Sequence, residues 1–327
     1  MRIVMLATGD IAIPAFRVLL REKRVAALVT QPDRPVGRHQ ALTPPRIKRI
    51  AVEQGVPVLQ PESLRTPDVI QSLRQLAPDF LVVIAYGQIL PQSVIDIPRK
   101  ACVNVHASLL PRHRGASCVQ AAIDAGDSET GVTIMHVVRK LDAGDIILQR
   151  KIPLRGIETA DDLSDALAAL APGALNEALA LLDVGKAPRE RQDEQLSSYA
   201  PKLLRADGRI DWNQPAYIVE RKIRACHSWP GSFTTYPSVR RGKDRSLKIY
   251  PPVDVISMKP VKEGALPGEV LKSGLDGLYV ACHPGILRIT ALQPEGGRKM
   301  NAESFFAGHA IYPGMILGLS REDASLS

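Results

Sequence analysis

The sequence predicts an α/β protein: a Rossmann-like domain with a mostly parallel sheet, followed by a small C-terminal β-barrel domain of the OB-like type. Three observations support this fold class. The chain has 327 residues, which suggests about two domains. Up to about residue 155, short β-branched runs alternate with helical segments, the pattern of βαβ units. From residue 208 the pattern changes to short strands separated by Gly and Pro turns, which is typical of a small barrel.

The first region contains five apolar runs that predict the strands of its sheet. They lie at residues 2–7, 25–30, 80–85, 102–107 and 131–138. Five helices are expected among and after them, at 14–21, at 44–54 with Thr43 as cap, at 67–76, at 117–125 and at 161–182. The last helix follows Thr159, has acidic residues in its first turn and ends near Gly185.

A polar stretch with two prolines and almost no apolar periodicity separates the two predicted domains. It predicts a linker. The expected boundaries are a first domain at 1–188, a linker at 189–206 and a barrel at 207–318. Within the barrel, strands are expected at 246–250, 268–273, 277–282 and 286–293.

The cysteines and the N-terminus indicate the compartment. Four cysteines, at 102, 118, 226 and 282, form no C-x-x-C pair, so their spacing predicts neither a disulfide framework nor a cysteine zinc site. The apolar run before Gly9 is too short for a signal sequence or a spanning helix. We therefore expect a cytoplasmic protein that does not bind membranes, and we expect a monomer.

The positive charge is concentrated in the last third of the chain. Of the net charge of +8, +6 lies after Ala200. Between Arg221 and Lys248, eight Lys and Arg residues stand against one acid, Asp244. Such a stretch of one sign favours binding of a polyanion such as nucleic acid. The alternative is a solvated basic face without a partner.

The first turn of the predicted sheet argues against a dinucleotide. It reads LATGDIAIP, with one glycine where the G-x-G-x-x-G fingerprint needs three. No G-x-x-x-x-G-K-[ST] motif is present either, which argues against the usual ATP or GTP site.

The segment CVNVHASLLPRHRGAS holds the first candidate site residues. Asn104 and His106 are two positions apart on a predicted strand, so they lie on one face, near the carboxyl end where open α/β sheets bind ligands. The alternative is a structural role, with His106 satisfied in the core. A zinc site made of His106, His113 and Asp142 matches no usual ligand spacing.

Asp142, in the turn LDAGD, is the third candidate. It follows a predicted strand and could reach the face that carries Asn104 and His106. A carboxylate beside a histidine favours the imidazolium and orients it for acid–base work near neutral pH. Alternatively, Asp142 only caps its turn. An amide, a histidine and an aspartate without an activated nucleophile suit direct attack of an amine on a carbonyl, with the oxyanion stabilised by Asn104 and protonated His106.

The segments VNVHASLLPRHRGAS and GVTIMHVVRKLDAGDI closely resemble the formyltetrahydrofolate-dependent formyltransferases. The resemblance implies that Asn104, His106 and Asp142 are the catalytic residues, that 10-formyltetrahydrofolate is the co-substrate and that no metal takes part. It also implies folate-binding residues in the SLLP turn and after the preceding strand: Ser108, Leu109, Leu110, Pro111, Tyr86 and Gly87.

Residues 29–64 and 199–234 resemble the members of this family that formylate methionyl-tRNA. This implies transfer of the formyl group to the α-amino group of initiator methionyl-tRNA. The cations implied in tRNA binding are Arg34, Arg38, Arg221, Lys222, Arg224 and Arg241.

The sequence departs from the family pattern at three places. Gln40 and Ala41 stand where the loop usually has two lysines, Cys118 stands in place of a proline, and His227-Ser228 replaces Asn-Pro before Trp229. Two alternatives remain open: an N-formyltransferase for amino-sugar nucleotides, and an RNA-binding protein without catalysis. The intact Asn104, His106 and Asp142 set argues against the second.

Overall fold

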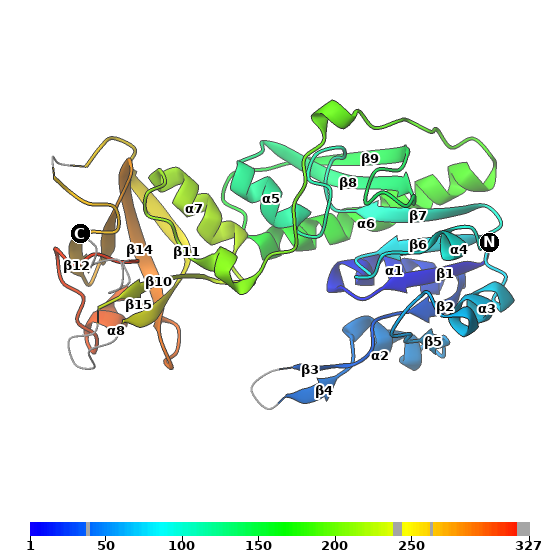
Figure 1. Ribbon diagram of the computed structural model, residues 1–327, viewed down its shortest axis with the longest axis horizontal. Coiled ribbons are helices and arrows are strands. Elements are labelled where there is room, and N and C mark those ends of the chain that lie inside the picture. Colours follow the sequence, from blue (N-terminus) through cyan, green and yellow to red (C-terminus); the bar gives the residue numbers. More distant parts are fainter. Residues whose placement is uncertain (37–39, 238–243, 262–263, 319–327) are drawn as a thin grey trace. The chain divides into compact units, whose positions relative to one another are not determined.

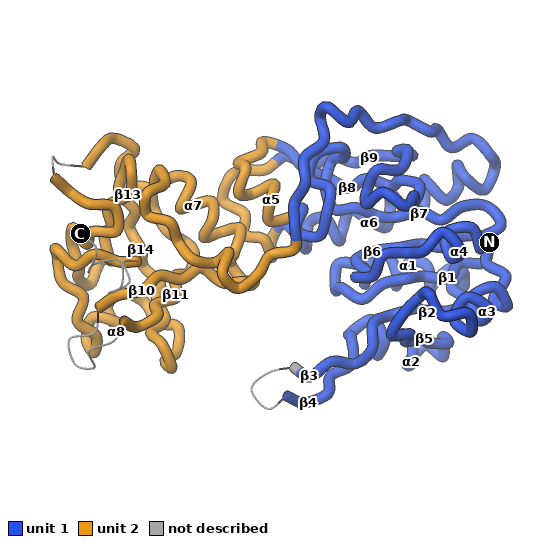
Figure 2. The backbone as a smooth tube through the Cα atoms, in the orientation of Figure 1, with its two compact units in different colours: residues 1–118, 129–153, 163–201 blue, residues 119–128, 154–162, 202–327 orange. Residues whose placement is uncertain are grey.

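The computed structural model describes residues 1–36, 40–237, 244–261 and 264–318, and the chain divides into two compact units (Figures 1 and 2). Unit 1 comprises residues 1–118, 129–153 and 163–201, and unit 2 comprises residues 119–128, 154–162 and 202–327. Two short segments from the first half of the chain therefore fold with the C-terminal region. The sequence-based boundaries at 1–188, 189–206 and 207–318 stay a prediction.

Unit 1 is built on a seven-stranded sheet with the order β5-β2-β1-β6-β7-β8-β9. The strands are β1 (Ile3–Ala7), β2 (Val25–Val29), β5 (Val58–Leu59), β6 (Phe80–Ile84), β7 (Ala101–His106), β8 (Glu129–His136) and β9 (Ile146–Pro153). The first five strands run parallel, whereas β8 and β9 pair antiparallel. The predicted mostly parallel α/β fold is confirmed.

The central strands β1 and β6 are buried along their whole length, which explains why they are continuous apolar runs in the sequence. The helices are α1 (Ile13–Arg21), α2 (Arg46–Glu53), α3 (Pro67–Gln75), α4 (Gln92–Ile95), α5 (Cys118–Ala125) and α6 (Ala160–Asp183). These bounds match the five predicted helices to within a few residues, and α4 is a further short helix.

The predicted cap at Thr43 is wrong. Thr43 ends β4 (Ala41–Thr43), which pairs with β3 (Arg34–Val36) in a separate hairpin, and the residue that precedes α2 is Pro45. The two prolines at 44 and 45 explain the later start, because a residue before proline is disfavoured in the helical region. The antiparallel edge strand β9 was also not predicted, since its exposed residues interrupt the apolar run.

Helix α6 is long and apolar enough, by length and composition alone, to cross a membrane. Within unit 1, however, one stripe of the helix is buried: Leu163, Leu167, Ala171, Ala174, Leu175, Ala178 and Leu179. This spacing is that of an amphipathic helix packed in a folded domain. Glu177 forms an ion pair with Arg150 of β9, and Asp183 forms one with Lys100, the residue before β7.

Unit 2 contains an antiparallel sheet with the order β10-β11-β14-β13-β12, and β15 pairs with β14. The strands are β10 (Ser232–Tyr236), β11 (Arg245–Ser257), β12 (Val270–Gly274), β13 (Gly277–Cys282), β14 (Gly285–Pro294) and β15 (Met300–Asn301), with helices α7 (Ala216–Ala225) and α8 (Ala302–Phe306). Alternating residues of β11 and β14 pack with α7 in one apolar core. The small antiparallel C-terminal domain is confirmed, although α7 and β10 were not predicted.

Candidate active site

Asn104 and His106 lie on β7, whose residues pair with parallel β6 on one side and antiparallel β8 on the other. The two positions are separated by one residue, so both side chains leave the same face of the sheet. His106 is the last residue of the strand and is buried. The structure thus places the candidate pair at a carboxyl strand end, where ligands bind in open α/β sheets.

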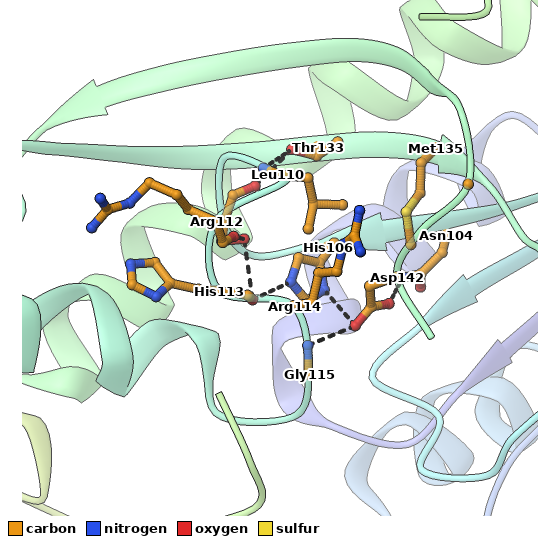
Figure 3. A network of polar contacts seen from close by, with 12 residues as sticks. Asn104, His106, Leu110, Arg112, His113, Arg114, Gly115, Thr133, Met135 and Asp142 are labelled. Carbon is orange, nitrogen blue, oxygen red and sulfur yellow. Dashed lines mark hydrogen bonds and ion pairs between the residues drawn. The ribbon is translucent and has the colours of Figure 1, made fainter. Parts of the chain in front are cut away.

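Asp142 lies in the turn between β8 and β9 and completes the cluster (Figure 3). Its Oδ2 accepts a hydrogen bond from the backbone N–H of Gly115 at 2.8 Å and lies 3.7 Å from Nδ1 of His106. Its Oδ1 accepts from Nδ2 of Asn104 at 3.4 Å. The three residues that the sequence singled out therefore meet in one network.

The hydrogen bonds of His106 fix its tautomer and favour its charged form. Nε2 lies 2.9 Å from the carbonyl oxygen of His113, and since a carbonyl only accepts, Nε2 carries a hydrogen. Burial opposes protonation, but the contact with Cys118, the Asp142 carboxylate and the His113 carbonyl outweigh it and raise the pKa of His106 to about 9. The imidazolium is therefore the main form at neutral pH.

The SLLP turn next to His106 is held rigidly by hydrogen bonds. Ser108 is fully buried, and its hydroxyl donates to the carbonyl of Arg112 at 2.8 Å. Thr133 of β8 donates to the carbonyl of Ser108 at 2.7 Å and accepts from the N–H of Leu110 at 3.1 Å. Leu110 packs into a small apolar cluster, which leaves Leu109 and Pro111 as the partly exposed members of the turn.

Tyr86 and Gly87 follow β6 at the same edge of the sheet. The Tyr86 side chain is in the core, its hydroxyl has no hydrogen-bond partner among the described residues, and burial raises its pKa to about 12. Its carbonyl accepts hydrogen bonds from Thr8 at 3.0 Å and Gln31 at 3.2 Å. Tyr86 thus faces away from solvent and ties the ends of three strands together through its backbone.

Across the described residues, no group of three or more His, Cys, Asp or Glu side chains is arranged to hold a metal ion. His106, His113 and Asp142 do not form one, because Nε2 of His106 bonds the backbone carbonyl of His113. The contacts that join Asn104, His106 and Asp142 are hydrogen bonds and one ion pair.

Two family comparisons cover most of the chain. Residues 1–179 match the formyl transferase family, and residues 202–310 match the formyl transferase C-terminal domain. A methionyl-tRNA formyltransferase of Akkermansia muciniphila is 56% identical over 309 residues, which is 94% of this chain and 97% of the relative. Another, of Geobacter metallireducens, is 43% identical over 97% of this chain and 98% of the relative.

The chain belongs to the methionyl-tRNA formyltransferase family. Solved structures of this formyltransferase fold are more distant. HypX from Aquifex aeolicus in complex with tetrahydrofolic acid has a TM-score of 0.61 at 19% identity, over 94% of this chain and 47% of that one. The sugar 3N-formyl transferase WlaRD has a TM-score of 0.63 at 15% identity, over 92% and 98%. The sugar enzymes therefore share the fold alone.

The cations predicted to bind tRNA have different surroundings in this formyltransferase. Arg38 and Arg241 lie outside the described residues. Arg34, on β3, is exposed and 4.0 Å from Glu62. On α7, Nζ of Lys222 is 3.6 Å from the Asp124 carboxylate.

The other two α7 cations differ in exposure. Arg221 donates to the carbonyl of Ala125 at 3.4 Å, and its guanidinium lies 5.2 Å from the Tyr217 ring centre. Arg224 is buried, forms a two-point ion pair with Glu220, and donates to the carbonyl of Glu158 at 2.8 Å. The charge of Arg224 is thus neutralised inside unit 2.

A cavity of about 360 Å³ in unit 2 is lined by these α7 residues and by the loop after β9. Its walls carry cations such as Arg155 and anions such as Glu158, so it has no single sign of charge. Asn104, His106 and Asp142 do not line it.

Sequence reasoning missed the residues that support the site from outside the motifs. Gln149 donates to the carbonyl of Leu110 at 2.9 Å, and Gln192 donates to the carbonyl of Asp142 at 2.9 Å. Gln149 lies on the unpredicted strand β9 and Gln192 in the expected linker. A lone glutamine in a polar stretch carries no spacing signal, so the sequence offered no means of finding either residue.

Proposed function

We propose that this enzyme, a formyltransferase by its family, transfers the formyl group of 10-formyltetrahydrofolate to the α-amino group of initiator methionyl-tRNA at the cluster of Asn104, His106 and Asp142. The observation that carries this proposal is the convergence of an amide, a buried imidazole and a carboxylate at one strand end. No serine or cysteine nucleophile with a general base is needed, because the amine itself attacks the formyl carbon.

The geometry supports an oxyanion site made of Asn104 and His106. The 3.7 Å separation of Nδ1 of His106 from Asp142 exceeds a normal hydrogen bond, so the Nδ1–H is available to the formyl oxygen. Asn104 donates only at 3.4 Å to Asp142 and keeps a second amide hydrogen free. As the amine nitrogen bonds to the formyl carbon, these two donors stabilise the negative oxygen.

Asp142 supports the second half of the reaction. The carbon–nitrogen bond to the folate breaks, the oxyanion collapses to the new formamide, and the leaving nitrogen takes up a proton. Asp142 stabilises the imidazolium through its charge. It also assists the transfer of a proton from the attacking amine to the leaving nitrogen of the folate.

We propose that the folate lies against the SLLP turn. Leu109 and Pro111 are its partly exposed apolar members, whereas Ser108 and Leu110 are buried and hold the shape of the turn. For Tyr86 and Gly87, a role through the backbone fits best, since the Tyr86 ring is in the core.

Region 207–318 is proposed to bind the tRNA, with the exposed Arg34 of the hairpin and with Arg38 and Arg241, which lie outside the described residues, as further contacts. On α7, Arg221 and Lys222 suit phosphate contacts better than the buried Arg224.

A monomer in the cytoplasm is also proposed. The four cysteines are all free and buried, which suits a reducing compartment. Size-exclusion chromatography with light scattering tests the monomer, since a dimer would double the measured mass.

The decisive experiment supplies 10-formyltetrahydrofolate together with either charged initiator tRNA or an amino-sugar nucleotide. We expect formyl-methionyl-tRNA as the product, and turnover at least about 100-fold lower in His106→Ala, the scale of a lost oxyanion donor. Formylation of the sugar, or near wild-type turnover of His106→Ala, would overturn the proposal.

A further inference from the structure

The segment from Glu190 to Ala200, expected as a free linker, is fixed to unit 1 at both ends. Glu190 exchanges two backbone hydrogen bonds with Ile146 of β9, at 2.8 and 3.0 Å. Ala200 donates to the carbonyl of Arg114 at 2.7 Å, and the N–H of Arg114 donates to Ser198 at 2.8 Å. The segment therefore connects the start of β9 with the loop that carries Gly115.

Between these two anchors, the side chain of Gln192 is buried and fully used. Its Nε2 donates to the carbonyl of Asp142 at 2.9 Å and to the carbonyl of Gly144 at 2.8 Å. Its Oε1 accepts from Nε and Nη2 of Arg114 at 3.1 and 2.8 Å. The orientation of the amide is thus determined, because two carbonyls demand donors and a guanidinium demands an acceptor.

The turn to which Gln192 is hydrogen-bonded has a strained backbone. Asp142 has a φ of 49°, in the left-handed region, which residues other than glycine adopt at a cost. Such a conformation persists only where its surroundings impose it. Gly144 is packed so closely that a Cβ there would lie 1.8 Å from the carbonyl oxygen of His136, so this position of the turn has no room for a side chain.

Arg114 links Gln192 to the loop that carries Gly115. Its side chain is 6% exposed, and it forms two hydrogen bonds with Glu194, at 3.1 and 3.2 Å. Hydrogen bonds from Arg114 and Lys140 lower the pKa of Glu194 to about 2, so this carboxylate stays charged. The residue after Arg114 is Gly115, whose N–H holds the Asp142 carboxylate.

We propose that Gln192 is a positioning residue for formyl transfer. Its two amide donors hold the backbone of the Asp142 turn, and through Arg114 the same side chain holds the loop whose N–H orients the Asp142 carboxylate. A displacement of either part changes the distance from Asp142 to His106. The inference rests on the proposed catalytic role of these two residues.

The test replaces the amide donors of Gln192 but keeps an acceptor for Arg114. In Gln192→Glu, one carboxylate oxygen still accepts from Arg114, but the other faces two carbonyl oxygens and repels them. Gln195→Glu is the matched control, because Gln195 is exposed in the same segment. Gln192→Met, similar in length and without donors, is the second variant, and it decides the outcome if Gln192→Glu does not fold.

We expect kcat to fall at least about tenfold in both Gln192 variants, on the scale of small misplacements of catalytic groups. The KM values for tRNA and formyl-folate should stay within about twofold, and the alkaline limb of the pH–kcat profile should move to lower pH. NMR of ¹³C-labelled histidine should report the same fall in the pKa of His106. Gln195→Glu should match the wild type in all three measurements.

Unchanged kcat in both folded Gln192 variants would overturn the proposal. So would a lower kcat with an unmoved alkaline limb, or failure of both variants to fold, since either result marks a structural residue only. His106→Ala is measured alongside. If it keeps normal turnover, the proposed function itself fails, whereas an inactive His106→Ala beside normal Gln192 variants removes the role of Gln192 alone.

Discussion

The cluster of Asn104, His106 and Asp142 in unit 1, which we propose to be catalytic, and the cations of α7 in unit 2 hold their charges in different ways. At the cluster, His106 is buried, and its nearest carboxylate, Asp142, lies 3.7 Å from Nδ1, so the charge of the imidazolium is supported but not fully paired. On α7, the buried Arg224 meets Glu220 in a two-point ion pair and is neutralised where it lies. A charge that is left partly unpaired is available for chemistry, and a fully paired one supports the fold.

The same difference explains why the count of cations overstated the basic surface. Between Arg221 and Lys248 the sequence shows one acid, but α7 receives two more partners from outside that stretch. Glu220 precedes it by one position and faces Arg224 four residues along the helix, and Asp124 approaches Lys222 from α5. Net charge describes a segment, whereas a binding surface depends on which charges remain exposed.

The largest expected effect comes from removing the charge of Asp142 while keeping its shape. Asp142→Asn should lower kcat by about 100-fold or more. The imidazolium loses the carboxylate that stabilises it, and the transferred proton loses the group that accepts it. Steady-state formylation of tRNA measures it. Asp145→Asn is the control, since Asp145 lies on the same turn and its carboxylate pairs with Arg189 at 3.2 Å. An equal fall of kcat in both variants would contradict the prediction, because it would show that the turn is disturbed rather than that a catalytic group is lost.

Breaking the buried pair on α7 is expected to affect the stability of the protein rather than its turnover. Arg224→Met should destabilise the protein by about 3–5 kcal/mol, because Glu220 is left without its partner in a largely buried position. Chemical denaturation measures the loss, and Lys222→Met should cost no more than about 1 kcal/mol, as expected for a more exposed pair. If Arg224→Met instead kept full stability and lost tRNA affinity selectively, Arg224 would be an RNA contact after all.

The two regions also differ in how far the sequence alone could predict them. The proposed catalytic residues fall in short motifs. Strand spacing places Asn104 and His106 on one face, and Asp142 lies in the loop that follows the next strand. The supporting residues Gln192 and Arg114 lie 78 positions apart. Their contact depends on the path of the whole chain, which periodicity does not reveal. Burial of Arg224 likewise depends on helix α7, which was not predicted although Ala216, Val219 and Ile223 have the spacing of one helix face.

A smaller effect is expected from the thiol that contacts His106. Cys118 contributes to raising the pKa of His106 to about 9, so at neutral pH the active imidazolium predominates and activity should fall as pH rises through that value. Cys118→Ala removes one support of the charged form, so the alkaline limb should move to lower pH, with little change in kcat near pH 6. The pH–rate profile measures the shift. Cys226→Ala serves as control, and a limb at the same pH in both variants would contradict the prediction.

The smallest expected effect is on the salt dependence of tRNA binding, and it tests whether the partly exposed cations Arg221 and Lys222 of α7 contact RNA. Each cation that neutralises a phosphate releases counterions, so affinity falls with salt with a log–log slope of roughly −0.7 to −0.9 per contact. The double variant Arg221→Ala with Lys222→Ala should therefore make the slope shallower by roughly one to two. It should weaken the binding of charged and uncharged tRNA alike, because phosphate contacts do not read the amino acid.

The control for a general loss of positive charge is Arg155→Ala. Arg155 is an exposed cation that lines the cavity of unit 2 and pairs with Glu158. Filter binding at several salt concentrations gives the slopes. If the double variant keeps the wild-type slope, Arg221 and Lys222 belong to a solvated face without a partner, and the tRNA phosphates lie on another surface of the protein.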